Sequence, residues 1–394
     1  MKFPRTIFTI LTLAAAVPVL SCASLGQPTG GPGAFLAGTD ADYSALGLSK
    51  AGTAIWEDGM RTDGGPGSYE WWYTDAELED GTIIVTVFYT KDHFDVPGPA
   101  KPTAEIQITY PDGTSLRRTV YLNPGTTLSA SKRLCEVTAG ECFLRYDDGR
   151  YEIRSVDRDF EYSATSTSTL PMWRPETGFI FFGREKGAYF AWFVAQPSAV
   201  VSATLKVGGQ VRDLKGRGYH DHNWGNAPMN KLINHWYWGR VRIGDYTVIT
   251  SDIETAKKFG FARIPLFMIA RNGEILEDRR ARLSVLRQDT VQHPVTGKFI
   301  DNRLTFTECS EDETQYKVEY IREHDILVMD RDSLPGKMRF LASLVGANPT
   351  YVRTLGQVRL TITRGQTVES LEQEGLWEQM FFGSNTTATI GAQE

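Results

Sequence analysis

AEIQITYPDGTSLRRTVYL, residues 104–122, predicts two β-strands joined by a tight turn. Its first half alternates apolar and polar residues, which is the pattern of a strand with one buried face. PDG at 111–113 is typical of a turn, because proline fixes φ and glycine accepts a positive φ. Strands on either side of such a turn pair antiparallel, so we expect a β-hairpin here.

The same pattern of short strands and turns continues along most of the chain. Helical periodicity is scarce, and the best candidate is a short C-terminal helix at 367–382, where Leu371, Leu376 and Met380 form a rough apolar stripe. Many short strands with almost no long helix predict an all-β protein built of barrels or sandwiches. The strand-like segments lie at 82–90, 104–122, 150–157, 177–197, 202–221, 234–253, 265–278, 303–309, 315–330 and 358–364.

The strands are too many for one small barrel, so we expect two β-domains. The division falls near residues 225–235, giving an N-terminal domain at 46–230 and a C-terminal domain at 231–390. No strict sequence repeat marks this boundary.

Composition limits the class of partner. The 394 residues are 41% hydrophobic and 23% charged, which is an ordinary globular composition. The net charge of -6, without a long basic run, argues against nucleic acid, since phosphate binding needs a concentrated positive surface. Aromatic residues make up 11% of the chain, which fits either an aromatic-lined cavity or a β-rich core.

The N-terminus has the features of a secretory signal. MKFPR supplies the charged region, TIFTILTLAAAVPVL the apolar region and SCA a small-residue cleavage site, so we expect a signal peptide at 1–23. The alternative is a lipoprotein anchored at Cys22. A flexible Gly-, Pro- and Ser-rich leader is predicted at 24–45, and no other segment reaches membrane-spanning length.

The cysteines and one sequon fit the secretory pathway. Cys135 and Cys142 are close enough in sequence to form a disulfide across a hairpin, which leaves Cys309 free. These thiols lack a CxxC spacing and so do not indicate a zinc site. NTT at Asn385 is the one glycosylation sequon, because Pro349 disqualifies NPT.

SYEWWYTD at 68–75 places a carboxylate in an aromatic strand. Side chains alternate along a strand, so Glu70 and Trp72 share one face while Trp71 and Tyr73 share the other. A carboxylate facing into a barrel beside indole rings is poorly solvated, which raises its pKa and makes it a candidate proton donor. The alternative is a surface glutamate beside a packed tryptophan.

GYHDHNWG at 218–225 places two histidines, an aspartate and an asparagine between glycines. A strand would place His220, His222 and Trp224 on one face, opposite Asp221 and its flanking residues. Two histidines two residues apart can share a metal ion.

Three interpretations of this motif remain open. A metal would need a third ligand from His235, Asp252 or Glu70, in no recognisable spacing. A second interpretation is a hydrogen-bonded network, in which Asp221 or Asn223 orients a histidine beside a cavity. The third is a tight loop held by polar side chains, with glycines permitting the backbone. We expect the second, as a hydrogen-bonded corner, and no metal.

HWYWGRV at 235–241 adds a third aromatic motif, and Asp252 follows it as a second possible acid. The chain has no GxSxG, and its glycine pairs lie in hairpin turns, so neither a serine nucleophile nor a nucleotide cradle is indicated.

EWWYTD, GYHDHNWG and HWYWGRV, in this order, resemble the hydroxyneurosporene synthase (carotenoid 1,2-hydratase) superfamily, which includes the fungal Diels–Alderases. The resemblance covers about residues 50–390, although only the motifs are specific. It implies two lipocalin-like β-domains with a substrate pocket and no metal or organic cofactor. Members act on bulky, apolar, polyunsaturated molecules.

The resemblance also implies where the chemistry lies. Carotenoid hydratases protonate a polyene with an acidic residue, helped by a histidine, a tryptophan and a tyrosine. In this sequence His222 and Trp224 match the histidine and the tryptophan, and Asp252 is the best candidate for the acid. Tyr246 is not at a clearly matching place for the tyrosine. The predicted catalytic residues are therefore His222, Asp252 and Glu70. The predicted substrate-binding residues are Trp72, Tyr73, Tyr89, His220, Asn223, Trp224, Tyr237 and Trp238.

The secretory signal and sequon favour the hetero-Diels–Alderase branch, which implies a cofactor-independent pericyclase acting on a polyene or terpenoid–polyketide. A cycloaddition needs no nucleophile, because holding a flexible substrate near its reactive fold lowers the barrier. An acid could also drive loss of water to a quinone methide before cyclisation. The alternatives are a polyene hydratase and a non-catalytic carrier of an apolar ligand.

Overall fold

The computed structural model describes residues 33–121, 128–330 and 349–382. Nearly all of their secondary structure is β-strand, in two sheets, which confirms the predicted all-β class. The chain divides into two compact units, the first built mainly from Leu36–Phe181 and Glu185–Met229 and the second mainly from Asn230–Glu394.

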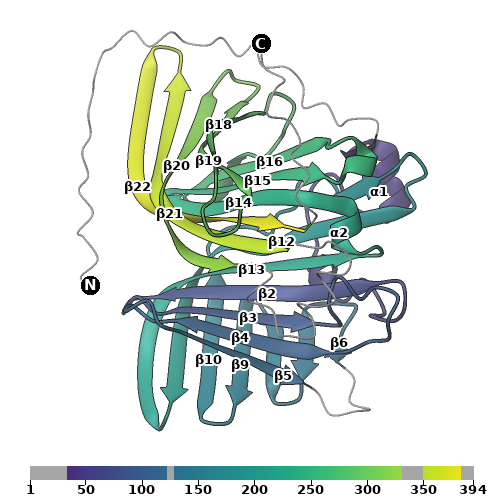
Figure 1. Ribbon diagram of the computed structural model, residues 1–394, viewed down its shortest axis with the longest axis vertical. Coiled ribbons are helices and arrows are strands. Elements are labelled where there is room, and N and C mark those ends of the chain that lie inside the picture. Colours follow the sequence, from purple (N-terminus) through teal and green to yellow (C-terminus); the bar gives the residue numbers. More distant parts are fainter. Residues whose placement is uncertain (1–32, 122–127, 331–348, 383–394) are drawn as a thin grey trace. The chain divides into compact units, whose positions relative to one another are not determined.

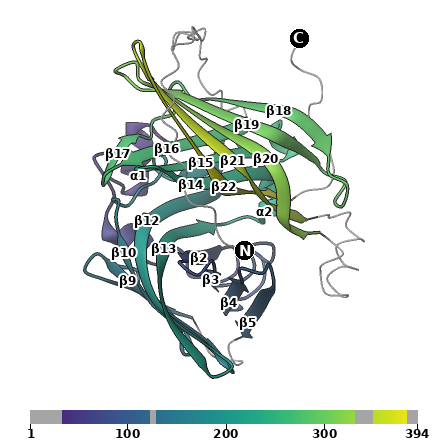
Figure 2. The same cartoon turned by 90° about the vertical axis from the view of Figure 1, so that its left-hand side faces the viewer.

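The first sheet wraps around its own core. Figure 2 shows it curling, with the strands of residues 150–168 opposite those of residues 69–121. Trp72 and Phe88 from one side pack in the same core as Tyr162 and Leu205 from the other, which gives the open barrel of a lipocalin-like fold. The order is β5 (Ser115–Tyr121), β4 (Thr103–Thr109), β3 (Ile83–Tyr89), β2 (Tyr69–Leu78), β13 (Gln210–Gly225), β12 (Ala188–Val207), β10 (Phe160–Ser168), β9 (Arg150–Asp157), β8 (Cys142–Asp147), β7 (Glu136–Ala139) and β6 (Ser129–Ala130), with β11 (Phe179–Phe182) between β12 and β1 (Ala34–Leu36).

The hairpin predicted at 104–122 is present as β4 and β5. Ala104, Ile106 and Ile108 are buried while the residues between them are partly exposed, as alternation predicts. Gly113 has φ of 83° in the turn and donates its N–H to the Tyr110 carbonyl at 2.9 Å. Local sequence therefore determines this element.

The second sheet has nine strands and a separate core. Figure 1 draws most of its strands in green and yellow. Its centre is aromatic and β-branched, with Tyr246, Phe267, Tyr320 and Trp377 buried together. The order is β17 (Glu274–Glu277), β16 (Arg263–Arg271), β15 (Tyr246–Thr255), β14 (Ile233–Ile243), β22 (Thr367–Phe381), β21 (Thr350–Arg364), β20 (Gln315–Met329), β19 (Phe299–Cys309) and β18 (Ser284–Gln292). The helical elements are α1 (Asp40–Leu46), α2 (Met229–Leu232) and the 3₁₀ turns η2 (Ile55–Asp58) and η3 (Lys257–Phe259).

The C-terminal helix predicted at 367–382 is wrong, because this segment forms β22. Every residue of β22 pairs with β21, from Thr367 opposite Arg364 to Phe381 opposite Thr350. Its glutamate, glutamine and leucine residues favour helices, but the ladder with β21 and the burial of Trp377 outweigh that preference.

The prediction of a flexible leader at 24–45 is wrong for residues 33–45, which are the part of it that the structure describes. α1 begins there in a capping box: the Thr39 hydroxyl accepts the Asp42 backbone N–H at 3.2 Å, and the Asp42 carboxylate accepts the Thr39 backbone N–H at 3.1 Å. The glycine- and proline-rich residues before it conceal this signal. The predicted signal peptide at 1–23, with Cys22, and the sequon at Asn385 lie outside the described residues. None of the described helices is long and apolar enough to cross a membrane.

The predicted disulfide between Cys135 and Cys142 is wrong, because both are free, buried thiols. Cys142 faces Ala139 at the turn of the β7–β8 hairpin, whereas Cys135 lies opposite Tyr146 towards the open end. Each residue along a strand adds about 3.3 Å, so the two side chains are further apart than a disulfide spans. Cys309, predicted to be free, is disulfide-bonded.

Candidate functional site

The first two aromatic motifs lie side by side because β2 pairs antiparallel with β13. Trp72 is opposite His222 and Tyr73 is opposite Asp221 in this register. Consecutive side chains alternate between the two faces of the sheet, as the sequence predicts. The pair of strands therefore presents one polar group to the barrel interior and another to the opposite face.

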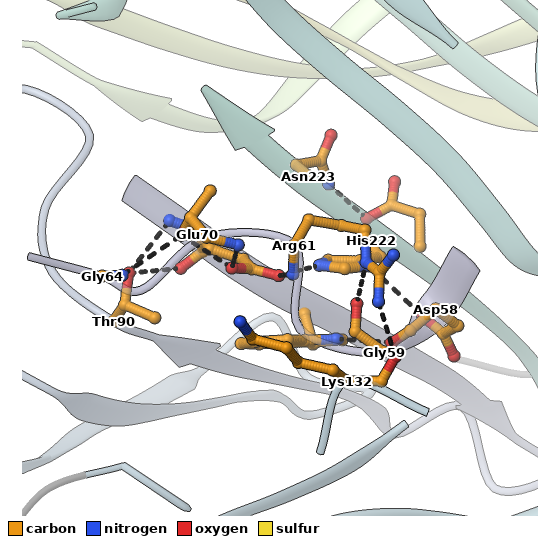
Figure 3. A network of polar contacts seen from close by, with 12 residues as sticks. Asp58, Gly59, Arg61, Gly64, Glu70, Thr90, Lys132, His222 and Asn223 are labelled. Carbon is orange, nitrogen blue, oxygen red and sulfur yellow. Dashed lines mark hydrogen bonds and ion pairs between the residues drawn. The ribbon is translucent and has the colours of Figure 1, made fainter. Parts of the chain in front are cut away.

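On the interior face, Glu70 holds His222. The His222 Nε2 atom lies 2.7 Å from Glu70 Oε1, and neither residue is exposed. Glu70 also accepts the backbone N–H groups of Arg61 at 2.6 Å and Thr62 at 2.7 Å. Figure 3 shows Glu70 between Arg61 and Thr90. The inward-facing interpretation of Glu70 is confirmed, and its carboxylate is fixed by several donors.

Aromatic rings enclose His222 on this face. The Trp72 indole stacks on the imidazole, with ring centroids 4.6 Å apart and an interplanar angle of 13°. The Trp224 ring lies 4.8 Å from it. Trp72 also donates its indole N–H to the Asp58 backbone carbonyl at 3.1 Å. The histidine is thus fixed in position as well as hydrogen-bonded.

Asp58, at the end of η2, is the second buried acid of this group. Its Oδ2 atom lies 3.0 Å from His220 Nε2 and accepts the Tyr151 hydroxyl at 2.6 Å. Burial acts to raise the pKa of Asp58, but the charge and hydrogen bond of His220 bring it below its ordinary value. Burial acts to lower the pKa of His220, and Asp58 raises it above its ordinary value.

This arrangement corrects the predicted network. The partners that orient the two histidines are Glu70 and Asp58, whereas Asp221 and Asn223 lie on the other face of β13 and cannot reach them. The motif is also the end of a regular strand instead of a hydrogen-bonded corner. Asp58 gave no sequence signal, because it lies in a short 3₁₀ turn without periodicity.

On the opposite face, Asp221 is the centre of a second polar group. Its Oδ2 atom accepts the Trp192 indole N–H at 3.0 Å and the Tyr219 hydroxyl at 2.8 Å, and its Oδ1 atom accepts the Asn223 amide at 2.8 Å. Burial raises the pKa of Asp221 to about 6, although these donors act to lower it. Asp221 therefore carries a carboxyl group that titrates near neutral pH.

Partly exposed aromatic side chains line the same face. The Tyr73 ring contacts the Tyr219 ring edge-on at 6.2 Å, and its hydroxyl donates to Asp75 at 3.2 Å. The Trp71 ring lies 6.4 Å from the Tyr89 ring. Burial, followed by the charge of Glu105, raises the pKa of Tyr89, and the charge of Asp221 has the smallest of the effects on it. Of the predicted binding residues, Tyr73, Tyr89 and Asn223 thus lie near Asp221.

The remaining predicted residues lie in the second unit. Asp252 is buried between Arg263 and Arg287, with the Arg287 Nε atom 2.7 Å from its Oδ2 atom. Burial acts to raise the pKa of Asp252, but the two guanidinium groups lower it to about 2. A carboxylate held in this way is ionised near neutral pH, which does not favour the predicted role of Asp252 as the acid. Tyr237 donates to Asp301 at 2.7 Å, and Trp238 lies beside it on β14.

Fold and site together describe an all-β chain in which ionisable groups lie among aromatic rings. Residues 182–288 match the family described as carotenoid hydratase CrtC. This region contains the GYHDHNWG and HWYWGRV motifs and confirms the resemblance to the carotenoid hydratase superfamily.

Known relatives extend this comparison. The chain is 32% identical over 210 residues to hydroxyneurosporene dehydrogenase of Chlorobaculum tepidum, covering 45% of this chain and 54% of the relative. It is 26% identical over 199 residues to the quinolone epoxide rearrangement protein asqO of Emericella nidulans, covering 47% and 54%. The chain thus matches about half the length of these curated relatives. An AttH-like protein of Nitrosomonas europaea shares the fold, with a TM-score of 0.56 at 16% identity over 84% of this chain and 97% of that one.

Proposed function

We propose that the protein is a cofactor-independent pericyclase that dehydrates and then cyclises a polyene or terpenoid–polyketide in fungal secondary metabolism. The observation that supports this proposal is the Asp221 carboxyl group, which titrates at about 6 among partly exposed aromatic rings. Two relatives, a hydroxyneurosporene dehydrogenase and a quinolone epoxide rearrangement protein, are named for reactions of unsaturated or strained organic molecules.

In the proposed first step, protonated Asp221 transfers its proton to a benzylic hydroxyl group of the substrate. The C–O bond breaks and water leaves, while the phenolic O–H of the substrate returns a proton to the Asp221 carboxylate. The products are a quinone methide, water and the regenerated acid, so the step is balanced. Hydrogen bonds from Trp192 and Tyr219 stabilise the carboxylate while it is ionised.

In the second step, the quinone methide and an alkene of the substrate form the ring without a nucleophile. The surrounding Trp71, Tyr73 and Tyr89 rings provide an apolar surface on which a flexible chain can be held close to its reactive fold. Such positioning lowers a barrier by several kcal/mol, on the order of what intramolecular reactions gain. The intramolecular and hetero-Diels–Alder forms of the reaction use the same surface.

An ¹⁸O-labelled-water experiment separates this proposal from a hydratase. A polyene with a benzylic alcohol is incubated with the purified protein in labelled water, and the product is analysed by mass spectrometry and chiral chromatography. We expect one stereoisomer of a cyclic product, lighter than the substrate by one water and free of label. Label in the product would establish hydration instead, and recovery of unchanged substrate bound to the protein would establish a carrier.

The proposal includes passage through the secretory pathway. The apolar N-terminal segment at 1–23 and the sequon at Asn385 support a cleaved signal peptide and a glycosylated product. N-terminal sequencing of the secreted protein, with and without glycosidase treatment, tests both. A mature chain that begins at Met1, or one attached through a lipid at Cys22, contradicts the signal-peptide assignment.

A further inference from the structure

The two interior histidines each have one ring nitrogen fixed by an acceptor. His220 Nδ1 lies 2.8 Å from the Tyr73 carbonyl, and His222 Nε2 lies 2.7 Å from the Glu70 carboxylate. A carbonyl and a carboxylate can only accept, so both of these nitrogens carry hydrogen. In a neutral imidazole the other nitrogen then has a free lone pair. A hydrogen bond from one ring nitrogen to a carbonyl or carboxylate orients metal-binding histidines in many proteins.

The second nitrogen of each ring is directed at Asp58, and that of His220 is hydrogen-bonded to it. His220 Nε2 is 3.0 Å from Asp58 Oδ2, and His222 Nδ1 is 3.6 Å from Asp58 Oδ1. His222 Nδ1 and Asp58 Oδ1 are buried and have no hydrogen-bond partner among the described residues. A lone pair facing a carboxylate is unfavourable unless a proton or a cation lies between them. Figure 3 shows the His222 side chain beside Asp58.

A buried thiol completes the group. The ligand atoms of Asp58, Cys135 and His220 all lie within 4.8 Å of one another, and none of the three residues is exposed. The three come from η2, the residue before β7, and β13, so only the fold brings them together. Cys135 was expected in a disulfide and Asp58 was not a candidate, which is why the sequence did not indicate this set.

We propose that Asp58, Cys135 and His220 bind a zinc ion inside the first barrel, with His222 as the neighbouring fourth donor. A thiolate, an imidazole and a carboxylate are the ligand types of tetrahedral zinc, whereas magnesium and calcium prefer oxygen ligands alone. A zinc ion with one thiolate and one carboxylate forms a neutral unit, which an apolar core can accommodate.

The proposed site has a structural role. It joins η2 to the β7 and β13 regions of the barrel, and its four side chains are buried, with Cys135 among the apolar core residues. Burial, with a smaller effect of the Asp58 charge, raises the pKa of Cys135 well above its ordinary value, so zinc binding displaces a thiol proton. The proposal is independent of the reaction assigned to Asp221, because Asp221 lies on the other face of β13.

Metal analysis of the full chain tests the site, with Cys142 as the matched control because it is a second buried free thiol of the same core. The wild type, Cys135→Ser and Cys142→Ser are produced in zinc- and in cobalt-supplemented medium and analysed by mass spectrometry for metal and by absorbance. We expect about one metal per chain in the wild type and Cys142→Ser, with a thiolate-to-cobalt charge-transfer band. Cys135→Ser should lack this band and retain at most a small fraction of the metal.

A stability measurement provides a readout that does not depend on the cobalt spectrum. We expect the unfolding temperature of the wild type and of Cys142→Ser to be higher for protein made with zinc than for protein made under chelation, and that of Cys135→Ser to be the same for both. A wild type that contains no stoichiometric metal overturns the proposal. So does a Cys135→Ser variant that binds metal as fully as the wild type.

Discussion

At the scale of single residues, Asp221 is held between two opposing effects. Burial disfavours its charge, while hydrogen bonds from Trp192, Tyr219 and Asn223 favour it, and the result is a pKa of about 6. An acid with this pKa can both donate and recover a proton near neutral pH. Asp252, with its pKa of about 2, cannot.

Replacing Asp221 tests the proposed acid. Asp221→Asn preserves the side-chain size but has no proton to transfer, so we expect kcat/KM to fall about 10²–10⁴-fold, the usual contribution of a positioned acid. The wild-type rate should fall as pH rises through about 6, because the protonated form is the active one. Steady-state kinetics between about pH 4 and pH 8 measure both.

The matched control is Asp213→Asn, which removes an exposed carboxylate from the same strand. It should leave the rate and the pH profile unchanged. An Asp221→Asn variant with the wild-type rate and profile would show that the acid lies elsewhere.

Asp221 should also make the stability of the fold depend on pH. Its pKa is raised from 3.8 to about 6 on folding, so between these values the folded chain binds more protons than the unfolded chain and stability decreases as pH rises. The shift corresponds to about 3 kcal/mol at 1.36 kcal/mol per unit. Urea unfolding measures the free energy of unfolding of wild type and Asp221→Asn across this range. As pH rises, the stability of the variant relative to the wild type should increase by roughly that amount. A difference between the two proteins that does not change with pH contradicts the prediction.

At the scale of elements, β21 and β22 are packed closely around a pair of glycines. Gly356 is opposite Gly375 in the ladder, and a Cβ atom on Gly375 would lie 2.7 Å from Val358 Cγ2. Trp377 fills the space that the missing side chains leave, because its ring would lie 2.7 Å from a Cβ atom on Gly356. These glycines are therefore required by packing.

Gly375→Ala distinguishes a strand from a helix by the sign of its effect. In the strand, we expect a loss of about 1–3 kcal/mol, because the added methyl group overpacks the core. In a helix, the same change would add about 1 kcal/mol of stability. Gly187→Ala, where the added atom meets open space, is the control and should change stability little. Chemical denaturation of the three proteins measures the difference.

How much the sequence predicts depends on whether a feature is local. The hairpin at 104–122 and the common face of His220, His222 and Trp224 follow from a period of two, and both are present. The prediction of a helix at 367–382 is wrong because the segment pairs with β21, a strand of 15 residues, and its own sequence carries no information about that partner.

The candidate site was only partly predictable for the same reason. Glu70 and His222 were identified separately, but their contact depends on the register of β2 against β13. Asp58 and Cys135 reach His220 through loops that give no periodic signal. The sequence contains a pattern around Asp221, because Tyr219 and Asn223 lie two residues before and after it and therefore on the same face of a strand. The prediction has Asp221 orient a histidine, whereas in the structure Asp221 accepts hydrogen bonds from Tyr219 and Asn223.

At the scale of the whole molecule, each unit has a separate apolar core. Phe193 lies in the core of the first sheet and Trp377 in that of the second, and neither core contains residues of the other. Separate cores predict that the units at 46–230 and 231–390 unfold as two domains, since a domain is defined by a core that can form alone.

Two core substitutions test this prediction by calorimetry of the full chain. Phe193→Ala and Trp377→Ala should each cost about 3–5 kcal/mol, the usual effect of emptying an aromatic site. If the units are separate domains, the wild type shows two overlapping transitions, and each variant lowers a different one while leaving the other in place. If both variants lower the same single transition together, the two sheets form one cooperative unit and the predicted domain boundary does not separate them energetically.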